Sequence, residues 1–120
     1  MEVTRAAIVV LVVALVLGGL FFLLRPDAQR GGPQNRTFDV SIKGGEMRPG
    51  EISVHKDDTV TLRVDTDEPT ELHLHGYDVE QEVQPGQEAK LQFKADLTGR
   101  YEIEDHETEK ELGVLQVRPR

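Results

Sequence analysis

The chain has 120 residues, of which 22 are acidic, 14 are basic and none is cysteine. This length allows one small domain, and the absence of cysteine excludes disulfides, thiol catalysis and thiolate-bound metal sites. After residue 25 the chain carries 21 acidic and 12 basic side chains, so it would repel phosphate backbones and is not expected to bind nucleic acid.

An apolar segment near the N-terminus predicts a membrane anchor. Residues 6–24 contain no charge, and Arg5 and Arg25 bracket them. As a helix this segment would be about 28 Å long, close to the hydrocarbon thickness of a bilayer. A cleaved signal peptide is the alternative, but the run exceeds the usual apolar region of such peptides and no A-x-A-like site follows it. We therefore predict a short flank over residues 1–5 and an uncleaved transmembrane helix over residues 6–25.

The charges around the anchor and its place in the chain favour opposite orientations. Arg25, Arg30 and Arg36 follow the segment, whereas only Arg5 and the amino terminus precede it. A count of positive charges would keep the C-terminal side in the cytoplasm. An N-terminal anchor followed by one folded domain usually exports that domain, however. We predict a single-pass protein of the cell membrane whose C-terminal domain is extracytoplasmic.

The anchor is followed by a linker. Pro26 ends the helix because proline cannot continue it. Residues 26–35 are mostly polar and contain Gly31-Gly32-Pro33, which predicts a flexible tether. The remaining residues, 36–120, form the predicted folded domain.

This domain alternates apolar and polar residues with a period of two, which is typical of half-buried strands. Seven short strands are predicted, over residues 38–43, 52–54, 59–64, 72–74, 89–95, 101–103 and 115–117. Glycine and proline turns such as Pro49-Gly50 and Pro85-Gly86 separate them at roughly ten-residue spacing, which indicates an all-β, Greek-key sandwich. Tyr101, just after Gly99, either forms a tyrosine corner with its hydroxyl on the backbone or is an ordinary half-buried strand tyrosine.

Two histidines at a spacing of two carry the main functional question. In a strand, His73 and His75 would share one face and Leu72 and Leu74 the other. Two imidazoles on one face are the minimum of a metal site, and they are also an ordinary polar face over an apolar core. The alternation alone leaves both interpretations open.

Four motifs, in order over some 80 residues, give the domain a family resemblance. They are E-L-H-L-H-G at 71–76, V-Q-P-G-Q at 83–87, G-R-Y-E-I at 99–103 and G-V-L-Q-V at 113–117. With these motifs the domain resembles the cupredoxins, most closely the small membrane-tethered cupredoxin-like domains of bacteria. The resemblance implies a cupredoxin-like β-sandwich and a role beside metal handling or envelope redox partners.

The copper ligands of blue-copper cupredoxins are missing. Asp105 falls on the position of the cysteine ligand and Thr108 on that of the histidine, and no methionine follows. Without a thiolate, type 1 electron-transfer chemistry is not expected. Another site could form from His73, His75 and His106, with Asp105 or Glu104 adding a carboxylate. Such nitrogen and oxygen ligands suit Cu(II), Zn(II) or Ni(II). The competing interpretation is a domain that kept the fold and lost the metal.

The chain shows no catalytic constellation, so an enzyme is not expected. The favoured hypothesis is a membrane-anchored extracytoplasmic binding or accessory module without a cofactor, which would contact an envelope protein. The alternative is a copper- or zinc-binding or metal-delivery protein that uses His73, His75 and His106.

Overall fold

A computed structural model describes residues 2–24 and 31–120, in two compact units, Met1–Gly32 and Pro33–Arg120, which are considered separately. The expected helix stop at Pro26 and the tether residues 26–30 lie outside the described residues.

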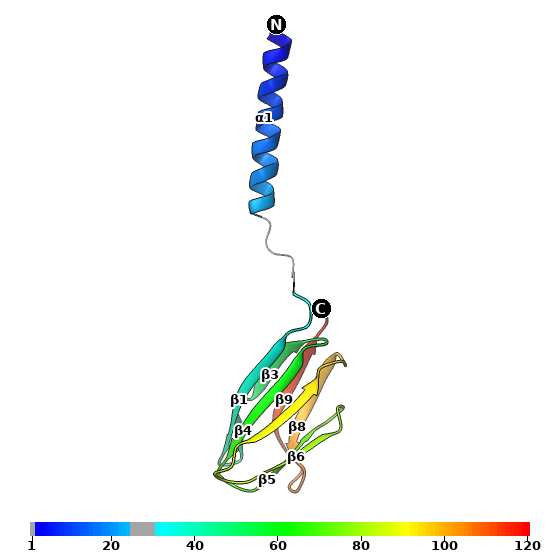
Figure 1. Cartoon of the computed structure of the whole chain (residues 1–120). Helices are drawn as coiled ribbons and strands as arrows, with labels where there is room; N and C mark the ends of the chain where they lie inside the picture. Colours follow the sequence, from blue (N-terminus) through cyan, green and yellow to red (C-terminus); the bar gives the residue numbers. More distant parts are fainter. Residues whose placement is uncertain (1, 25–30) are drawn as a thin grey trace. The chain divides into compact units, whose positions relative to one another are not determined.

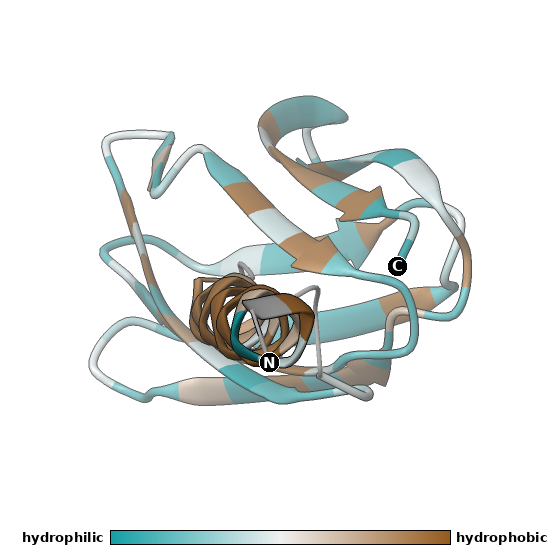
Figure 2. Ribbon diagram, turned by 90° about the horizontal axis from the view of Figure 1, so that it is seen from above, coloured by the Kyte–Doolittle hydropathy of each residue, from teal (hydrophilic) through white to brown (hydrophobic). Residues whose placement is uncertain are grey.

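Helix α1 (Glu2–Leu23) is apolar on every side, as Figure 2 shows by its nearly continuous brown ribbon. Its candidate span, Val3–Leu23, has 21 residues, and none of its most apolar window is buried. A helix of this length measures about 32 Å, which is enough to cross the hydrocarbon core. The prediction of one N-terminal helix that could span a membrane is therefore confirmed, and a signal sequence would share both its length and its composition.

The second unit is a sandwich of two β-sheets, with nine strands in the part of the chain that the structure describes (Figure 1). The strands are β1 (Asn35–Lys43), β2 (Glu46–Arg48), β3 (Glu51–His55), β4 (Thr59–Thr66), β5 (Thr70–Leu74), β6 (Val79–Val83), β7 (Ala89–Lys94), β8 (Gly99–Asp105) and β9 (Lys110–Arg118). The all-β sandwich prediction is confirmed. Strands β2 and β6 are additional to the seven expected ones. Strand β6 was not predicted because its sequence, V-E-Q-E-V, has only two apolar residues, which are four positions apart.

The chain passes repeatedly from one sheet to the other. One sheet has the order β2-β1-β4-β7 and the other β3-β9-β8-β5-β6. The β1–β4 and β3–β9 pairs are parallel, and the other pairs are antiparallel. Strand β5 thus lies between β6 and β8, which decides the neighbours of its histidines.

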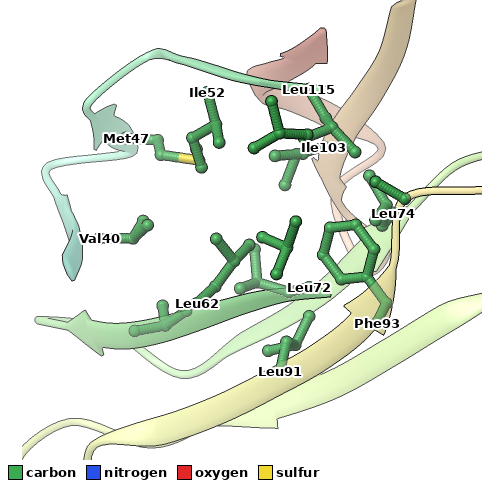
Figure 3. Packing of buried hydrophobic residues seen from close by; sticks show 14 of the residues in the cluster. Val40, Met47, Ile52, Leu62, Leu72, Leu74, Leu91, Phe93, Ile103 and Leu115 are labelled. Carbon is green, nitrogen blue, oxygen red and sulfur yellow. The ribbon is translucent and has the colours of Figure 1, made fainter. Parts of the chain in front are cut away.

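The inward-facing residues of both sheets form one aliphatic core (Figure 3). Strand β4 shows the alternation well: Val60, Leu62 and Val64 are buried and the residues between them are partly exposed. The labelled side chains of the two sheets point toward one another, and Phe93 is the aromatic ring among them. Close packing of these branched side chains stabilises a domain that has no disulfide.

Two tyrosines fix the end of the sandwich near the C-terminus of β5. The Tyr101 hydroxyl donates to the carbonyl oxygen of Thr98 at 2.8 Å, so the tyrosine corner is confirmed. The Tyr77 hydroxyl donates to the carbonyl oxygen of Leu97 at 2.6 Å, and its ring meets that of Tyr101 edge to face at 5.0 Å. Gly76 has a φ of 83°, and a Cβ atom at this position would clash with the Tyr101 ring.

One carboxylate, that of Asp58, is buried among polar partners and is only 1% exposed. It accepts hydrogen bonds from the backbone N–H groups of Gln34 at 2.9 Å and His55 at 3.0 Å, and it contacts the Arg120 guanidinium. Burial raises the pKa of Asp58, but the two N–H donors and Arg120 outweigh burial and hold this pKa below its ordinary value. Asp58 therefore links the beginning of the folded unit, at Gln34, to its last residue, Arg120.

Candidate metal centre

Strand β5 presents His73 on the outer face of the five-stranded sheet, and His75 lies in the turn directly after the strand. Leu72 and Leu74 are buried in the core, each 2% exposed, while His73 between them is only partly buried. The His73 and His75 rings lie next to each other, with centroids 4.5 Å apart. The prediction that both imidazoles share the face opposite the leucines is confirmed.

Strands β6 and β8 bring a carboxylate to each side of His73. The register places His73 opposite Glu80 of β6 and opposite Glu104 of β8. His73 Nε2 lies 3.8 Å from Glu80 Oε1, and His73 Nδ1 lies 3.5 Å from Glu104 Oε1. The two ring nitrogens of His73 therefore face different carboxylates.

His75 reaches the same Glu104 oxygen from the end of the strand. Its Nε2 lies 2.5 Å from Glu104 Oε1, and its backbone N–H donates to the Glu102 carbonyl at 3.0 Å. His73 Nδ1 and His75 Nε2 are buried atoms, and neither has a hydrogen bond of regular geometry to any described residue. Both nitrogens lie against the same Glu104 oxygen, and such misaligned contacts satisfy buried nitrogens less well than regular hydrogen bonds would. We call His73, His75 and Glu104 the inner group; one ligand atom from each lies within 4.8 Å of the other two.

The electrostatics keep Glu104 ionised. Contact with His75 is the main cause that lowers the pKa of the Glu104 carboxyl, burial opposes it, and His73 adds to the lowering. The Glu104 side chain is 16% exposed, as is that of His73. A carboxylate that stays charged beside two imidazole nitrogens is a ready set of metal ligands.

His106 belongs to a second, more exposed cluster. Its backbone N–H donates to the Glu71 carbonyl at 2.8 Å, which places its ring 5.5 Å from that of His73. We call His73, Glu80 and His106 the outer group; their ligand atoms also lie within 4.8 Å of one another. The structure thus brings together all three histidines that the sequence singled out.

Asp105 is not part of this cluster. Its register partner is Leu72, so it lies on the core-facing side of the sheet, opposite to His73. Its carboxylate accepts from the Glu107 N–H at 3.2 Å, and it belongs to neither ligand group of the described residues. Of the two carboxylates that the sequence offered, Glu104 is the one beside the histidines. Glu80 was missed because strand β6 was not expected.

Comparison with known proteins identifies the family of this chain. The chain belongs to the cupredoxin-like domain family, whose model matches residues 11–117. The resemblance derived from the four sequence motifs is thereby confirmed. A search of the curated proteins finds no match.

Several solved structures share the fold. An NMR solution structure of a copper binding protein in the apo form is 15% identical, with a TM-score of 0.63, and the match covers 75% of this chain and 93% of that one. The metal binding domain of the Cu(I) exporting P-type ATPase CopA of Streptococcus pneumoniae D39, with Cu(I), is 11% identical, with a TM-score of 0.60 and coverages of 70% and 94%. A chain of a heme-copper terminal oxidase dimer is 13% identical, with a TM-score of 0.60 and coverages of 98% and 100%. At these identities the likeness concerns the fold.

The residues of this chain do not fit the type 1 copper site of blue-copper cupredoxins. The cysteine position holds Asp105, on the other side of the sheet from His73, and the histidine position holds Thr108 in the turn after β8. Met47 is buried in the core against Gly113 and lies far upstream of the methionine position. Any metal chemistry of this domain must therefore come from another set of ligands.

Proposed function

We propose that this protein is a membrane-anchored cupredoxin-like module that binds one Cu(II) or Zn(II) ion through His73, His75 and Glu104. One observation carries the proposal: two buried imidazole nitrogens, without regular hydrogen bonds, face one oxygen of an ionised carboxylate. This geometry favours the metal-binding alternative over the metal-free accessory module that the sequence alone favoured.

The chemistry of the donor set supports a carrier or delivery role. Two imidazoles and one carboxylate suit borderline divalent ions, and three protein ligands leave positions open for water or a receiving ligand. The set lacks the thiolate on which type 1 electron transfer depends. We therefore propose storage or transfer of the ion, without enzymatic activity.

The setting of the domain completes the proposal. The helix anchors the protein as a single-pass chain in a bacterial cell membrane, with flank 1–5, anchor 6–25, tether 26–35 and an extracytoplasmic domain 36–120. The copper-binding proteins that share the fold support copper as the first ion to test. The acidic surface would attract cations and any basic envelope partner.

Calorimetric titration of the full-length, tag-free protein in detergent micelles tests the proposal. We expect one Cu(II) or Zn(II) ion per chain. His75→Ala should weaken binding by about 100-fold or more, because even loss of an outer-sphere partner costs about 10- to 100-fold. Nitrogen hyperfine structure in the Cu(II) electron paramagnetic resonance spectrum should disappear in part in the same variant.

The matched control is His55→Ala. His55 ends strand β3 and belongs to neither ligand group of the described residues. This variant should bind as the wild type does. Equal affinity of the wild type and His75→Ala would overturn the assignment of His75 as a ligand, and a wild type that binds no ion would restore the accessory module.

A further inference from the structure

We infer that the outer group receives the metal ion from solution and passes it to the inner group, with His73 as the ligand common to both. This inference rests on the proposed function and names the route by which the same site is filled. It assigns a role to Glu80 and His106 that ion storage by the inner group does not require.

Because the two ring nitrogens of His73 face different groups, the outer group and the inner group are alternative positions for one ion. Nε2 is directed toward Glu80 at 3.8 Å and Nδ1 toward Glu104 at 3.5 Å. A neutral imidazole has a single lone pair that can bind a metal, on whichever nitrogen carries no proton. One ion can therefore use Nε2 in the outer group or Nδ1 in the inner group, and two ions cannot both use a neutral His73.

Exposure gives the two groups an order. The Glu80 side chain is 50% exposed and His106 is exposed, whereas His73 and Glu104 are each 16% exposed. The His75 side chain is 45% exposed, but its Nε2, which faces Glu104, is a buried atom. An ion from solution therefore meets Glu80 and His106 first. Glu71 and Glu82 pair with each other two residues away on the same face, and their charges raise the local cation concentration.

The shift between groups conserves protons and explains the position of Glu80. When the ion leaves Nε2 for Nδ1, Nδ1 releases its proton to water and Nε2 takes one up. The new Nε2–H then faces Glu80 Oε1, which lies 3.8 Å from Nε2 in this structure, and a small approach of the carboxylate would let it accept this hydrogen bond and hold the tautomer that the inner group needs. Carboxylates commonly orient metal-binding histidines in this way. Glu80 is thus a ligand in the first stage and a positioning residue in the second.

Stopped-flow transfer of Zn(II) from a weak chromophoric chelator to the full-length protein in micelles tests the route. We expect His106→Ala to slow uptake of the ion by about tenfold. This lies within the range by which a charged site that concentrates an ion near its surface raises association rates. The affinity should stay within about twofold of the wild type, since a residue that only speeds entry and exit does not contact the ion in the inner group. Because the affinity is the ratio of the uptake and release rates, an unchanged affinity requires release to slow by the same factor as uptake. The control variant His55→Ala should change neither rate.

Two further variants separate this inference from the proposed function. His75→Ala should retain weak, rapidly exchanging binding by the outer group, and His75→Ala combined with His106→Ala should lose it. Wild-type uptake and release rates in His106→Ala would overturn the inference, as would a loss of affinity at an unchanged uptake rate or two ions per wild-type chain. Each of these results leaves the inner site standing, whereas a wild type that binds no ion overturns the proposed function itself.

Discussion

Two carboxylates of the domain, Asp58 and Glu104, are satisfied in different ways. Asp58 accepts two backbone N–H donors and meets a guanidinium. Glu104 faces two ring nitrogens that make no regular hydrogen bond. A fully bonded carboxylate stabilises the fold, whereas an incompletely bonded one leaves coordination capacity for an ion. This contrast separates a structural acid from a candidate ligand without reference to any relative.

Asp58→Asn should destabilise the domain by about 2 to 4 kcal/mol, because an amide cannot replace a buried carboxylate toward both N–H donors and Arg120. Urea unfolding followed by circular dichroism measures this loss. Asp57→Asn is the control: it removes the same charge one residue away, at a φ of 71° that asparagine tolerates. Equal midpoints for the two variants would contradict the assigned role of Asp58.

The same residue predicts a pH dependence. Because the folded-state pKa of Asp58 is lowered, its contribution is fully present above the ordinary pKa of about 3.9 and is lost as the pH falls through the folded-state value. The free energy of unfolding should therefore fall more steeply with acidification in the wild type than in Asp58→Asn. Parallel acid-unfolding curves for the wild type and Asp58→Asn would mean that the pKa of Asp58 is the same in the folded and unfolded states, which would contradict this prediction.

At the scale of elements, the strands could be predicted from alternation but their pairing could not. The period of two correctly placed His73 of β5 and His75, just after its end, on one face, because side-chain direction along an extended chain is local. The neighbours Glu80 and Glu104 come from strands that are joined to β5 by register, which is a non-local property. Asp105 and Glu104 are adjacent in sequence, and only the register decides which of them faces the histidines.

The turn after β5 gives a prediction at this scale. Gly76→Ala should cost about 2 to 4 kcal/mol, since it combines a left-handed backbone with a clash against the Tyr101 ring. Gly86→Ala is the matched control, because its φ is 77° but a Cβ there meets nothing within 4 Å. It should cost only about 1 to 2 kcal/mol. Thermal unfolding of both variants measures the difference, and equal losses would mean that the Tyr101 contact is unimportant.

At the scale of the whole molecule, the apolar helix and the ordered turn motifs were sufficient to predict one anchor candidate and the family fold. Both signals are strong in a single sequence: a long uncharged run, and several motifs in fixed order. The side of the membrane was harder to predict, because Arg5 and Arg36 stand on opposite sides of the segment and the charge count opposes the favoured orientation.

Fractionation of expressing cells tests the anchor and its orientation together. The protein should stay in the membrane pellet after carbonate washing, with the intact mass of the full chain, and protease added to spheroplasts should digest the β domain. A mature mass that lacks the first 24 or so residues would identify a signal peptide instead. Digestion only after detergent would place the domain in the cytoplasm.

The Asp58 contacts also have a mechanical consequence. The chain enters the sandwich at Gln34, whose carbonyl accepts from the Thr59 N–H at 2.9 Å and whose own N–H is held by Asp58. Beyond it, β1 runs parallel to β4 along eight register pairs. A force applied through the linker would therefore load the hydrogen bonds of Gln34 and the parallel β1–β4 pairing in shear. These contacts would resist the force before it reached β5 and its histidines.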